Sequence, residues 1–338
     1  MKNFVLIIGL GSMGKRRVRN LQALGVNNII GFDKRKDRRD ETALLYHIDT
    51  VESFEMALEK FKFDAFIISL PPDIHHIYMK IAIELGIPAF IEASVVDTDF
   101  EWMIAEANRK NVCLAPSCTL CFHPAIKKIA EVIQSNSLGK ISNILYHSGQ
   151  YLPDWHTYED VSEYYVSNKL TGGGREIVPF ELTWITLLLG LPKRVTGFYK
   201  NSIQIAGAEE IDDTYNVLMD YGQMIFNLSV DVVSRYATRR MVINGDKKQL
   251  YWNWDDNAIK IFDPEKAEWD SISYETISAQ SGYNKNITEQ MYIDEMSAFL
   301  HAVNDNSKFP NTLAHDHEVL KVLYAVERSD LNNRIERL

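Results

Sequence analysis

Short apolar runs alternate with helical patterns over the first third of the chain. Most runs are bounded by Gly, Pro or an acidic residue, as is typical of buried parallel strands. The predicted strands are 3–8, 29–32, 64–69, 88–91 and 112–115, and the predicted helices are 15–24, 74–85 and 100–110. Alternation at this spacing predicts βαβ units and a parallel sheet. Residues 1–120 are therefore expected to form a doubly wound α/β domain.

The pattern changes after Pro124, where alternating or β-branched segments dominate. The predicted strands are 141–148, 194–199, 214–219, 224–231 and 241–244, and the predicted helices are 125–134, 177–189, 288–303 and 315–328. This pattern favours an α+β domain over 121–338 with an open, mostly antiparallel sheet. A C-terminal helix is expected to be able to pack back on the first domain.

Composition narrows the function classes. The 338 residues carry 36 basic and 46 acidic side chains, a net charge of −10 that argues against a nucleic-acid partner. No apolar stretch reaches the ~18 residues that span a bilayer, so no membrane partner is expected. Three cysteines favour a cytoplasmic location over a disulfide framework. Cys118 and Cys121 lack a second cysteine pair, so no metal is expected.

The first predicted strand runs directly into a glycine-rich turn. Gly9, Gly11 and Gly14 form G-x-G-x-x-G between a strand and a helix, the context that makes this motif a dinucleotide fingerprint of the Rossmann fold. Gly9 permits the tight turn, Gly11 lets a pyrophosphate approach, and Gly14 lets the helix pack on the strand. The turn residues Ser12 and Met13 complete the predicted pyrophosphate site at the helix N-terminus.

The choice between NAD and NADP stays open at the second strand. Asp33 ends that strand 19 residues after Gly14, where an acid binds the ribose hydroxyls of NAD. Basic residues follow at once, and Arg35 is a candidate for a 2′-phosphate. An ordinary solvated helix start explains the same run of charges.

Two further strand ends are expected to border the nicotinamide, because ligands of open α/β sheets bind beyond the carboxyl ends of the strands. The candidates are Ser69, Leu70, Pro71, His75, Glu92 and Ala93. For His75, a place in the first turn of an ordinary helix is the alternative.

Several segments together resemble one known family. They are GLGSMGKRRVRNL, SLPPDIHH, the strand-end Glu92, CFHPAIKKI, GQYLPDWHTYEDVSEYY before LTGGG, and EQMYIDEMSAFLHAV. In this order they look like the Gfo/Idh/MocA family, the glucose–fructose oxidoreductase and inositol dehydrogenase group. The resemblance runs over nearly the whole chain. It implies a Rossmann domain, a second domain whose sheet face forms the substrate site, NAD or NADP as cofactor, and a homo-oligomer.

The sequence departs from the family at its catalytic positions. The family's Glu-Lys-Pro reads Glu92-Ala93-Ser94, and Cys121 stands where an arginine is expected. The family's inward Asp and His do not appear after the three glycines, and Phe180 lies nearest the histidine's place. The usual providers of a base beside the reacting hydroxyl are therefore replaced.

Other residues of the second domain are candidates for that base. They are Glu181, Lys169, Glu176 and His156. A carboxylate in a dry pocket can have its pKa raised enough to act as an acid or base.

Three functions remain open. The leading hypothesis is an NAD(P)-dependent oxidoreductase that acts on a sugar, cyclitol or nucleotide-sugar-like substrate. The alternatives are an enzyme that retains NAD with no net redox change, and a non-catalytic family member that binds a dinucleotide or sugar.

Overall fold

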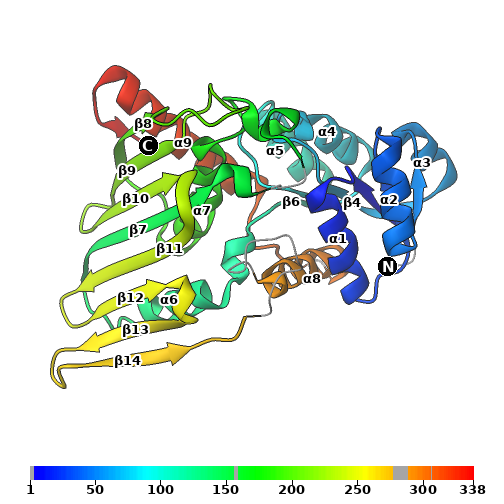
Figure 1. Ribbon diagram of the computed structural model, residues 1–338. Coiled ribbons are helices and arrows are strands. Elements are labelled where there is room, and N and C mark those ends of the chain that lie inside the picture. Colours follow the sequence, from blue (N-terminus) through cyan, green and yellow to red (C-terminus); the bar gives the residue numbers. More distant parts are fainter. Residues whose placement is uncertain (1–3, 156–158, 277–287, 306) are drawn as a thin grey trace. The chain divides into compact units, whose positions relative to one another are not determined.

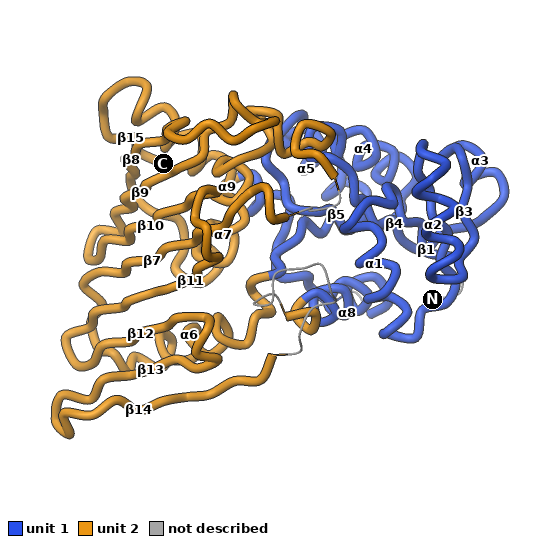
Figure 2. The backbone as a smooth tube through the Cα atoms, in the orientation of Figure 1, with its two compact units in different colours: residues 1–119, 292–317 blue, residues 120–291, 318–338 orange. Residues whose placement is uncertain are grey.

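The computed structural model describes residues 4–155, 159–276, 288–305 and 307–338, which form two compact units (Figures 1 and 2). The first unit contains residues 1–119 and 292–317, and the second contains residues 120–291 and 318–338. The chain first passes from the first unit to the second after residue 119, one residue before the boundary expected from the sequence. The first unit also includes most of helix α8 (Glu289–Asp305), which the sequence analysis had assigned to the second domain.

The first unit is built on a six-stranded sheet in the order β3-β2-β1-β4-β5-β6, with every neighbouring pair parallel. The strands are β1 (Phe4–Ile8), β2 (Ile29–Phe32), β3 (Asp49–Val51), β4 (Phe63–Ile68), β5 (Ala89–Ile91) and β6 (Leu114–Pro116). The helices between them are α1 (Ser12–Ala23), α2 (Lys36–Tyr46), α3 (Phe54–Lys60), α4 (His75–Leu85) and α5 (Phe100–Lys110). This is the expected Rossmann domain, although α2, β3 and α3 were not predicted.

Strand burial explains the apolar runs of the first unit. Val5 to Ile8 in β1 and Ala65 to Ile68 in β4 have no exposed surface, because helices cover both faces of a parallel sheet. At its far side, Phe90 in β5 packs edge-on against Phe299 of α8, with ring centroids 5.7 Å apart. The C-terminal segment therefore completes the core of the first unit.

The second unit is built on a nine-stranded mixed sheet in the order β14-β13-β12-β11-β7-β10-β9-β8-β15. Its strands are β7 (Ile141–Tyr151), β8 (Arg194–Lys200), β9 (Thr214–Asp220), β10 (Ile225–Asp231), β11 (Val233–Gly245), β12 (Gln249–Asn253), β13 (Ala258–Asp263), β14 (Glu268–Ser273) and β15 (Glu336–Arg337). Among the described strands, only β7 and β10 pair in parallel, so the sheet is mostly antiparallel as expected. The sequence pattern gave no bounds for β12, β13 and β14.

The two faces of this sheet differ. Helix α7 (Gly174–Leu189) packs on β9 and β10, and the unit also holds α6 (Pro124–Gln134) and most of α9 (Leu313–Asn332). Tyr146 is buried, whereas the side chains that alternate with the buried ones include Leu145, Leu218 and Phe198, which are 47%, 45% and 65% exposed. Within the described ranges, no helix is long and apolar enough to cross a membrane.

Candidate cofactor and substrate sites

The glycine turn after β1 has the geometry of a phosphate cradle. A Cβ on Gly9, where φ is +95°, would lie 2.3 Å from the carbonyl oxygen of Ser69, and a Cβ on Gly14 would lie 1.9 Å from the carbonyl oxygen of Gly9. Both glycines therefore serve the turn and the packing of α1 on β1. A Cβ on Gly11 would meet only Arg38, at 3.5 Å, so the space in front of Gly11 is open in this structure.

This open space lies at the N-terminus of α1, which begins at Ser12. The first N–H groups of a helix have no partner within the helix, and its dipole favours an anion there. No acidic side chain lies in the first turn, so none competes with a bound phosphate. The predicted residues Ser12 and Met13 thus lie where a pyrophosphate fits.

Asp33 is already held in place beside this turn. The backbone N–H of Leu10 donates to one carboxylate oxygen and that of Arg35 to the other, each at 2.8 Å. The residue is only 8% exposed. The carboxylate is therefore a fixed acceptor at the end of β2, as the ribose hydroxyls of NAD require.

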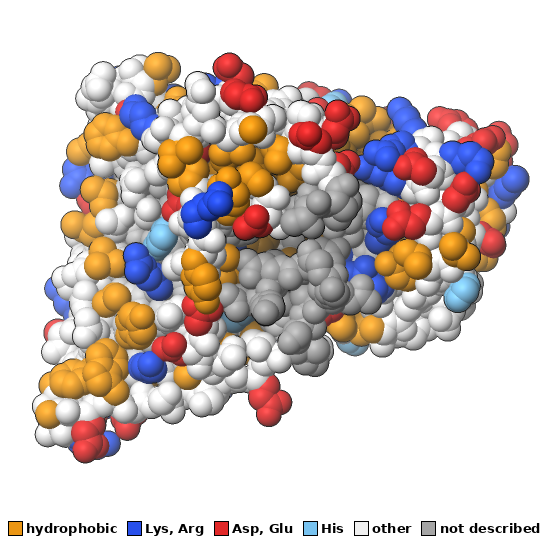
Figure 3. All heavy atoms as spheres, in the orientation of Figure 1, with side chains coloured by type: hydrophobic (Ala, Val, Ile, Leu, Met, Phe, Trp, Pro, Cys, Tyr) orange, Lys and Arg blue, Asp and Glu red, His pale blue; other side chains and the backbone are white. Residues whose placement is uncertain are grey.

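The basic run after Asp33 is largely paired within its own helix. Arg35 binds Asp37, Lys36 binds Asp40, and the guanidinium of Arg38 lies 3.9 Å from Asp33. Arg39 donates to the backbone carbonyls of Asp33 and Lys34. On the visible face of the first unit, basic and acidic side chains lie intermingled (Figure 3).

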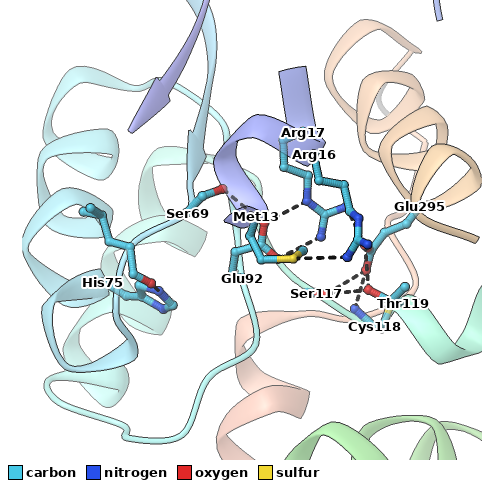
Figure 4. Close-up of polar contacts among 11 residues, drawn as sticks. Met13, Arg16, Arg17, Ser69, His75, Glu92, Ser117, Cys118, Thr119 and Glu295 are labelled. Atoms are coloured by element: carbon cyan, nitrogen blue, oxygen red, sulfur yellow. Dashed lines mark hydrogen bonds and ion pairs between the residues drawn. The ribbon is translucent and has the colours of Figure 1, made fainter. Parts of the chain in front are cut away.

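The loop after β4 is fixed by His75. Its Nε2 lies 2.7 Å from the carbonyl oxygen of Leu70, an acceptor, so this nitrogen carries the proton and donates it. Burial lowers the pKa of His75, which keeps the ring neutral. The hydrogen bond to Leu70 therefore fixes the backbone of the loop between Ser69 and His75 (Figure 4).

Glu92, at the end of β5, is held by an arginine that the sequence analysis did not single out. Arg17 of α1 donates Nε and Nη2 to the two carboxylate oxygens of Glu92, at 2.7 and 2.8 Å, and Ser69 donates its hydroxyl at 3.1 Å (Figure 4). Ala93 follows and offers no polar side chain. The strand-end residues predicted near the cofactor thus lie together in one unit.

In the second unit, Glu181 lies at the centre of a buried polar cluster. It accepts hydrogen bonds from Tyr146 and Ser148 at 2.8 Å, from Trp184 at 3.0 Å and from Arg239 at 2.9 Å. Glu181 has no exposed surface, and its carboxylate accepts four donors. Its environment is that of a charge held within the core.

Glu176, one and a half turns earlier on α7, has a different environment. The hydroxyl of Tyr165 donates to Oε1 at 2.6 Å, whereas the shielded Oε2 has no hydrogen-bond partner among the described residues. Burial raises the pKa of Glu176 to about 7, and the bond from Tyr165 only partly offsets this effect. The group can therefore gain or lose a proton near neutral pH.

The remaining catalytic candidates are placed as follows. The ammonium of Lys169 is 57% exposed and lies 3.8 Å from a carboxylate oxygen of Asp212. His156 lies outside the described residues. The structure brings Glu176 and Glu181 onto one helix but gives them separate partners.

Two family profiles cover most of the chain. The profile described as "Oxidoreductase family, NAD-binding Rossmann fold" matches residues 4–116, and the profile described as "GFO/IDH/MocA C-terminal domain" matches residues 126–251. The chain belongs to the Gfo/Idh/MocA family. Among curated protein sequences, none matches this chain.

Solved Gfo/Idh/MocA-like structures share the fold over the full length. Levoglucosan dehydrogenase in complex with NADH and levoglucosan aligns with a TM-score of 0.84 and 13% identity over 98% of each chain. An oxidoreductase from Agrobacterium radiobacter in complex with NAD⁺, L-tartaric acid and magnesium gives 0.84 and 12% identity over 100% of this chain and 98% of its own. GenD2 from gentamicin A biosynthesis in complex with NAD gives 0.80 and 15% identity over 99% and 95%.

Some polar residues of this Gfo/Idh/MocA chain were missed by the sequence analysis. Arg239 could have been found, because it alternates in β11 with the buried Met241 and Ile243. Arg17 is adjacent to the core residue Val18 but carries no pattern that pairs it with Glu92. Cys113, Cys118 and Cys121 are free thiols, and no metal-ligand cluster occurs among the described residues.

Proposed function

We propose that this protein is an NAD-dependent oxidoreductase that transfers hydride from a carbinol carbon, or to the corresponding carbonyl carbon, of a sugar, cyclitol or nucleotide-sugar-like substrate. Membership of an oxidoreductase family supports the reaction class. The phosphate cradle at Gly11 and the fixed carboxylate of Asp33 support the cofactor. The unpartnered Oε2 of Glu176 carries the proposal of catalysis, because it supplies a proton acceptor although the family's usual base is replaced.

The basic residues that follow Asp33 already bind acidic side chains or backbone carbonyls, which favours NAD over NADP. A 2′-phosphate would lie beside the carboxylate of Asp33, whose repulsion a free cation would have to overcome. Arg35 and Lys36 are already paired with acids of α2, and Arg39 with backbone carbonyls. We therefore expect NADH to bind at least tenfold more tightly than NADPH.

In the oxidation direction, Glu176 would accept the proton of the reacting hydroxyl, and a bound nicotinamide would supply the hydride acceptor. This step needs the carboxylate form, so the rate should fall as the pH drops below about 7. In the reduction direction the protonated form is needed, and the rate should fall above about 7. Because Glu181 is committed to four donors and Lys169 is exposed, we place the acid–base role on Glu176.

The first experiment is calorimetric titration of the purified protein with NAD⁺, NADH, NADP⁺ and NADPH, after a check for retained nucleotide. Micromolar NADH binding, followed by absorbance changes at 340 nm with a panel of sugars and cyclitols, supports the proposal. Retained nucleotide with no external turnover favours an enzyme without net redox change. Binding with no reaction across the panel favours a non-catalytic role, and no binding by any of the four contradicts the oxidoreductase assignment.

The second experiment tests Glu176 by the pH dependence of the rate. Glu176→Gln should lower kcat by about 10²–10⁴-fold with a small change in cofactor affinity, the range typical of acid–base residues. Tyr165→Phe removes the bond that lowers the pKa of Glu176, so the acidic limb of the oxidation profile should move to higher pH. Glu163→Gln is the matched control, because it removes the same charge from an exposed glutamate and should leave the pH profile unchanged. A native profile in Tyr165→Phe would contradict the role.

We also propose that the open face of the second sheet pairs with another copy of the chain. Leu145, Leu218 and Phe198 expose apolar surface on β7, β9 and β8 of this sheet, which is unusual for a face that stays in water. Light scattering of the native protein should give the mass of an oligomer, and Leu218→Lys should shift the mass toward that of the monomer.

A further inference from the structure

Arg17 occupies an unusual position for a charged side chain. It has no exposed surface and lies against the ring of Phe90, 4.5 Å from its centroid. Its fork holds both oxygens of Glu92, and Nη1 lies 3.0 Å from Oε2 of Glu295 on α8 (Figure 4). One permanently charged guanidinium therefore holds two carboxylates.

The two carboxylates differ in what else surrounds them. Glu295 accepts further hydrogen bonds from Ser117, from the backbone N–H of Cys118 and from Thr119, and it has no exposed surface. Glu92 keeps 12% of its side chain exposed and lies at the carboxyl end of the sheet, bonded to Ser69 beside the glycine turn. Glu295 is thus part of the core, whereas Glu92 lies at the edge where ligands of such sheets bind.

The charges around Glu92 explain why Arg17 is needed. The carboxylate of Glu92 faces Arg17 from α1, Glu295 and the phenol of Tyr292 from α8, and His75 from the start of α4. Burial raises the pKa of Tyr292 and lowers that of His75, so both are neutral near pH 7. Without Arg17, two like charges would share a poorly solvated space, and one carboxylate would bind a proton near neutral pH.

We propose that Arg17 is a positioning residue that fixes the carboxylate of Glu92 as a hydrogen-bond acceptor for the nicotinamide half of the cofactor. The bidentate pair sets the orientation of the carboxylate, and such forks are specific for Arg rather than Lys. This inference rests on the proposed function, because it assumes that a dinucleotide binds at the glycine turn.

The ion pair has a consequence for the chemistry of the first unit. Arg17 cannot release its proton, its guanidinium binds both oxygens of Glu92, and the side chain of Ala93 has no proton to move. The end of β5 is therefore suited to binding and orienting the cofactor.

The test is the pH dependence of NADH affinity, measured by fluorescence between pH 6 and 8 on the full chain. The change in affinity of the native protein over this range is the reference. In Arg17→Met, the Glu92–Glu295 pair gains a proton as the pH falls, so the affinity should weaken about tenfold more from pH 8 to 6 than in the native protein. The double variant Arg17→Met with Glu92→Gln should lose this extra dependence, since the two like charges no longer face each other.

Two variants separate positioning from mere loss of core packing. Arg16→Met removes the neighbouring buried arginine, which lies over Tyr292, so the pH dependence of this variant should parallel that of the native protein. Arg17→Lys keeps the charge but loses the fork, so its affinity should weaken at every pH without the extra dependence.

The single variant Glu92→Gln keeps the test decisive if Arg17→Met does not fold. It should weaken NADH binding about tenfold equally at pH 6 and 8. Native affinity in Glu92→Gln, or a folded Arg17→Met whose pH dependence matches that of the native protein, would overturn the inference. Failure of the native protein to bind NADH would instead contradict the proposed function, so the two failures are distinguishable.

Discussion

Gly11→Ala should separate cofactor binding from folding, because the methyl group enters open space. The new Cβ would lie 3.5 Å from the guanidinium of Arg38, an ordinary contact, and the backbone at Gly11 is extended, with φ of −70° and ψ of −163°. Losing Gly as helix N-cap costs a few tenths to about 1 kcal/mol, and the stiffer unfolded chain offsets about 0.4–1 kcal/mol. The net change in the free energy of unfolding should therefore stay within about 1 kcal/mol.

The effect on binding should be much larger. The methyl group occupies the space through which a pyrophosphate reaches the N–H groups at the start of α1, and each charge-assisted hydrogen bond contributes about 1.5–3 kcal/mol. Losing two of them corresponds to about 3–6 kcal/mol, or at least a hundredfold weaker NADH binding. Calorimetric titration measures the affinity, and thermal unfolding without ligand measures the stability.

Two other glycines supply the controls. Gly14→Ala would bring its Cβ within 1.9 Å of the backbone carbonyl of Gly9, so α1 must move and stability should fall by about 1–3 kcal/mol or more. Gly25→Ala lies where φ is +78° and nothing is near, so it should cost about 1–2 kcal/mol and leave NADH affinity unchanged. A Gly11→Ala protein that binds NADH within threefold of the native affinity would refute the reasoning.

Two further predictions concern buried carboxyl groups. Burial raises the pKa of Asp316 to about 6 although Asn311 donates a hydrogen bond to its carboxylate, so the native state holds the proton more tightly than the unfolded chain. Stability should therefore fall as the pH rises from about 4 to 6, by about 3 kcal/mol in all, and Asp316→Asn should remove this slope in denaturant unfolding curves. If the pH dependence of the stability persists in Asp316→Asn, another titrating group causes it. Glu181→Ala would leave Arg239 buried without its carboxylate and should cost about 3–5 kcal/mol, measured by urea unfolding. A loss below 1 kcal/mol would show that the ion pair contributes little to the fold.

Local patterns predicted those parts of the molecule in which neighbouring residues decide the structure. The strand Ile29–Phe32 and the helix Phe100–Lys110 have the bounds expected from their apolar residues and flanking breakers. Helix α2 was missed because its sequence is mostly polar and only Thr42 is buried, so it presents no apolar face to detect.

The candidate site was less predictable because its partners are distant in the chain. The glycine spacing located the turn, since a Cβ on Gly9 or Gly14 would clash with nearby backbone atoms. The pairing of Arg17 with Glu92 joins residues 75 positions apart, and that of Arg239 with Glu181 joins residues 58 apart. No periodicity encodes such pairs, so sequence reasoning could not tell the fully bonded Glu181 from the half-bonded Glu176.

The return of the chain to the first unit has a consequence for its synthesis. Residues Ser117 to Thr119 finish the first pass through that unit, yet the carboxylate that binds them belongs to Glu295. On a ribosome that produces the chain from its N-terminus, the first 119 residues must wait for more than 170 others before this core can close. Until then Phe90 and the guanidinium of Arg17 lack their partners from α8. The nascent Rossmann sheet is therefore exposed to aggregation and chaperone binding until α8 has been synthesised.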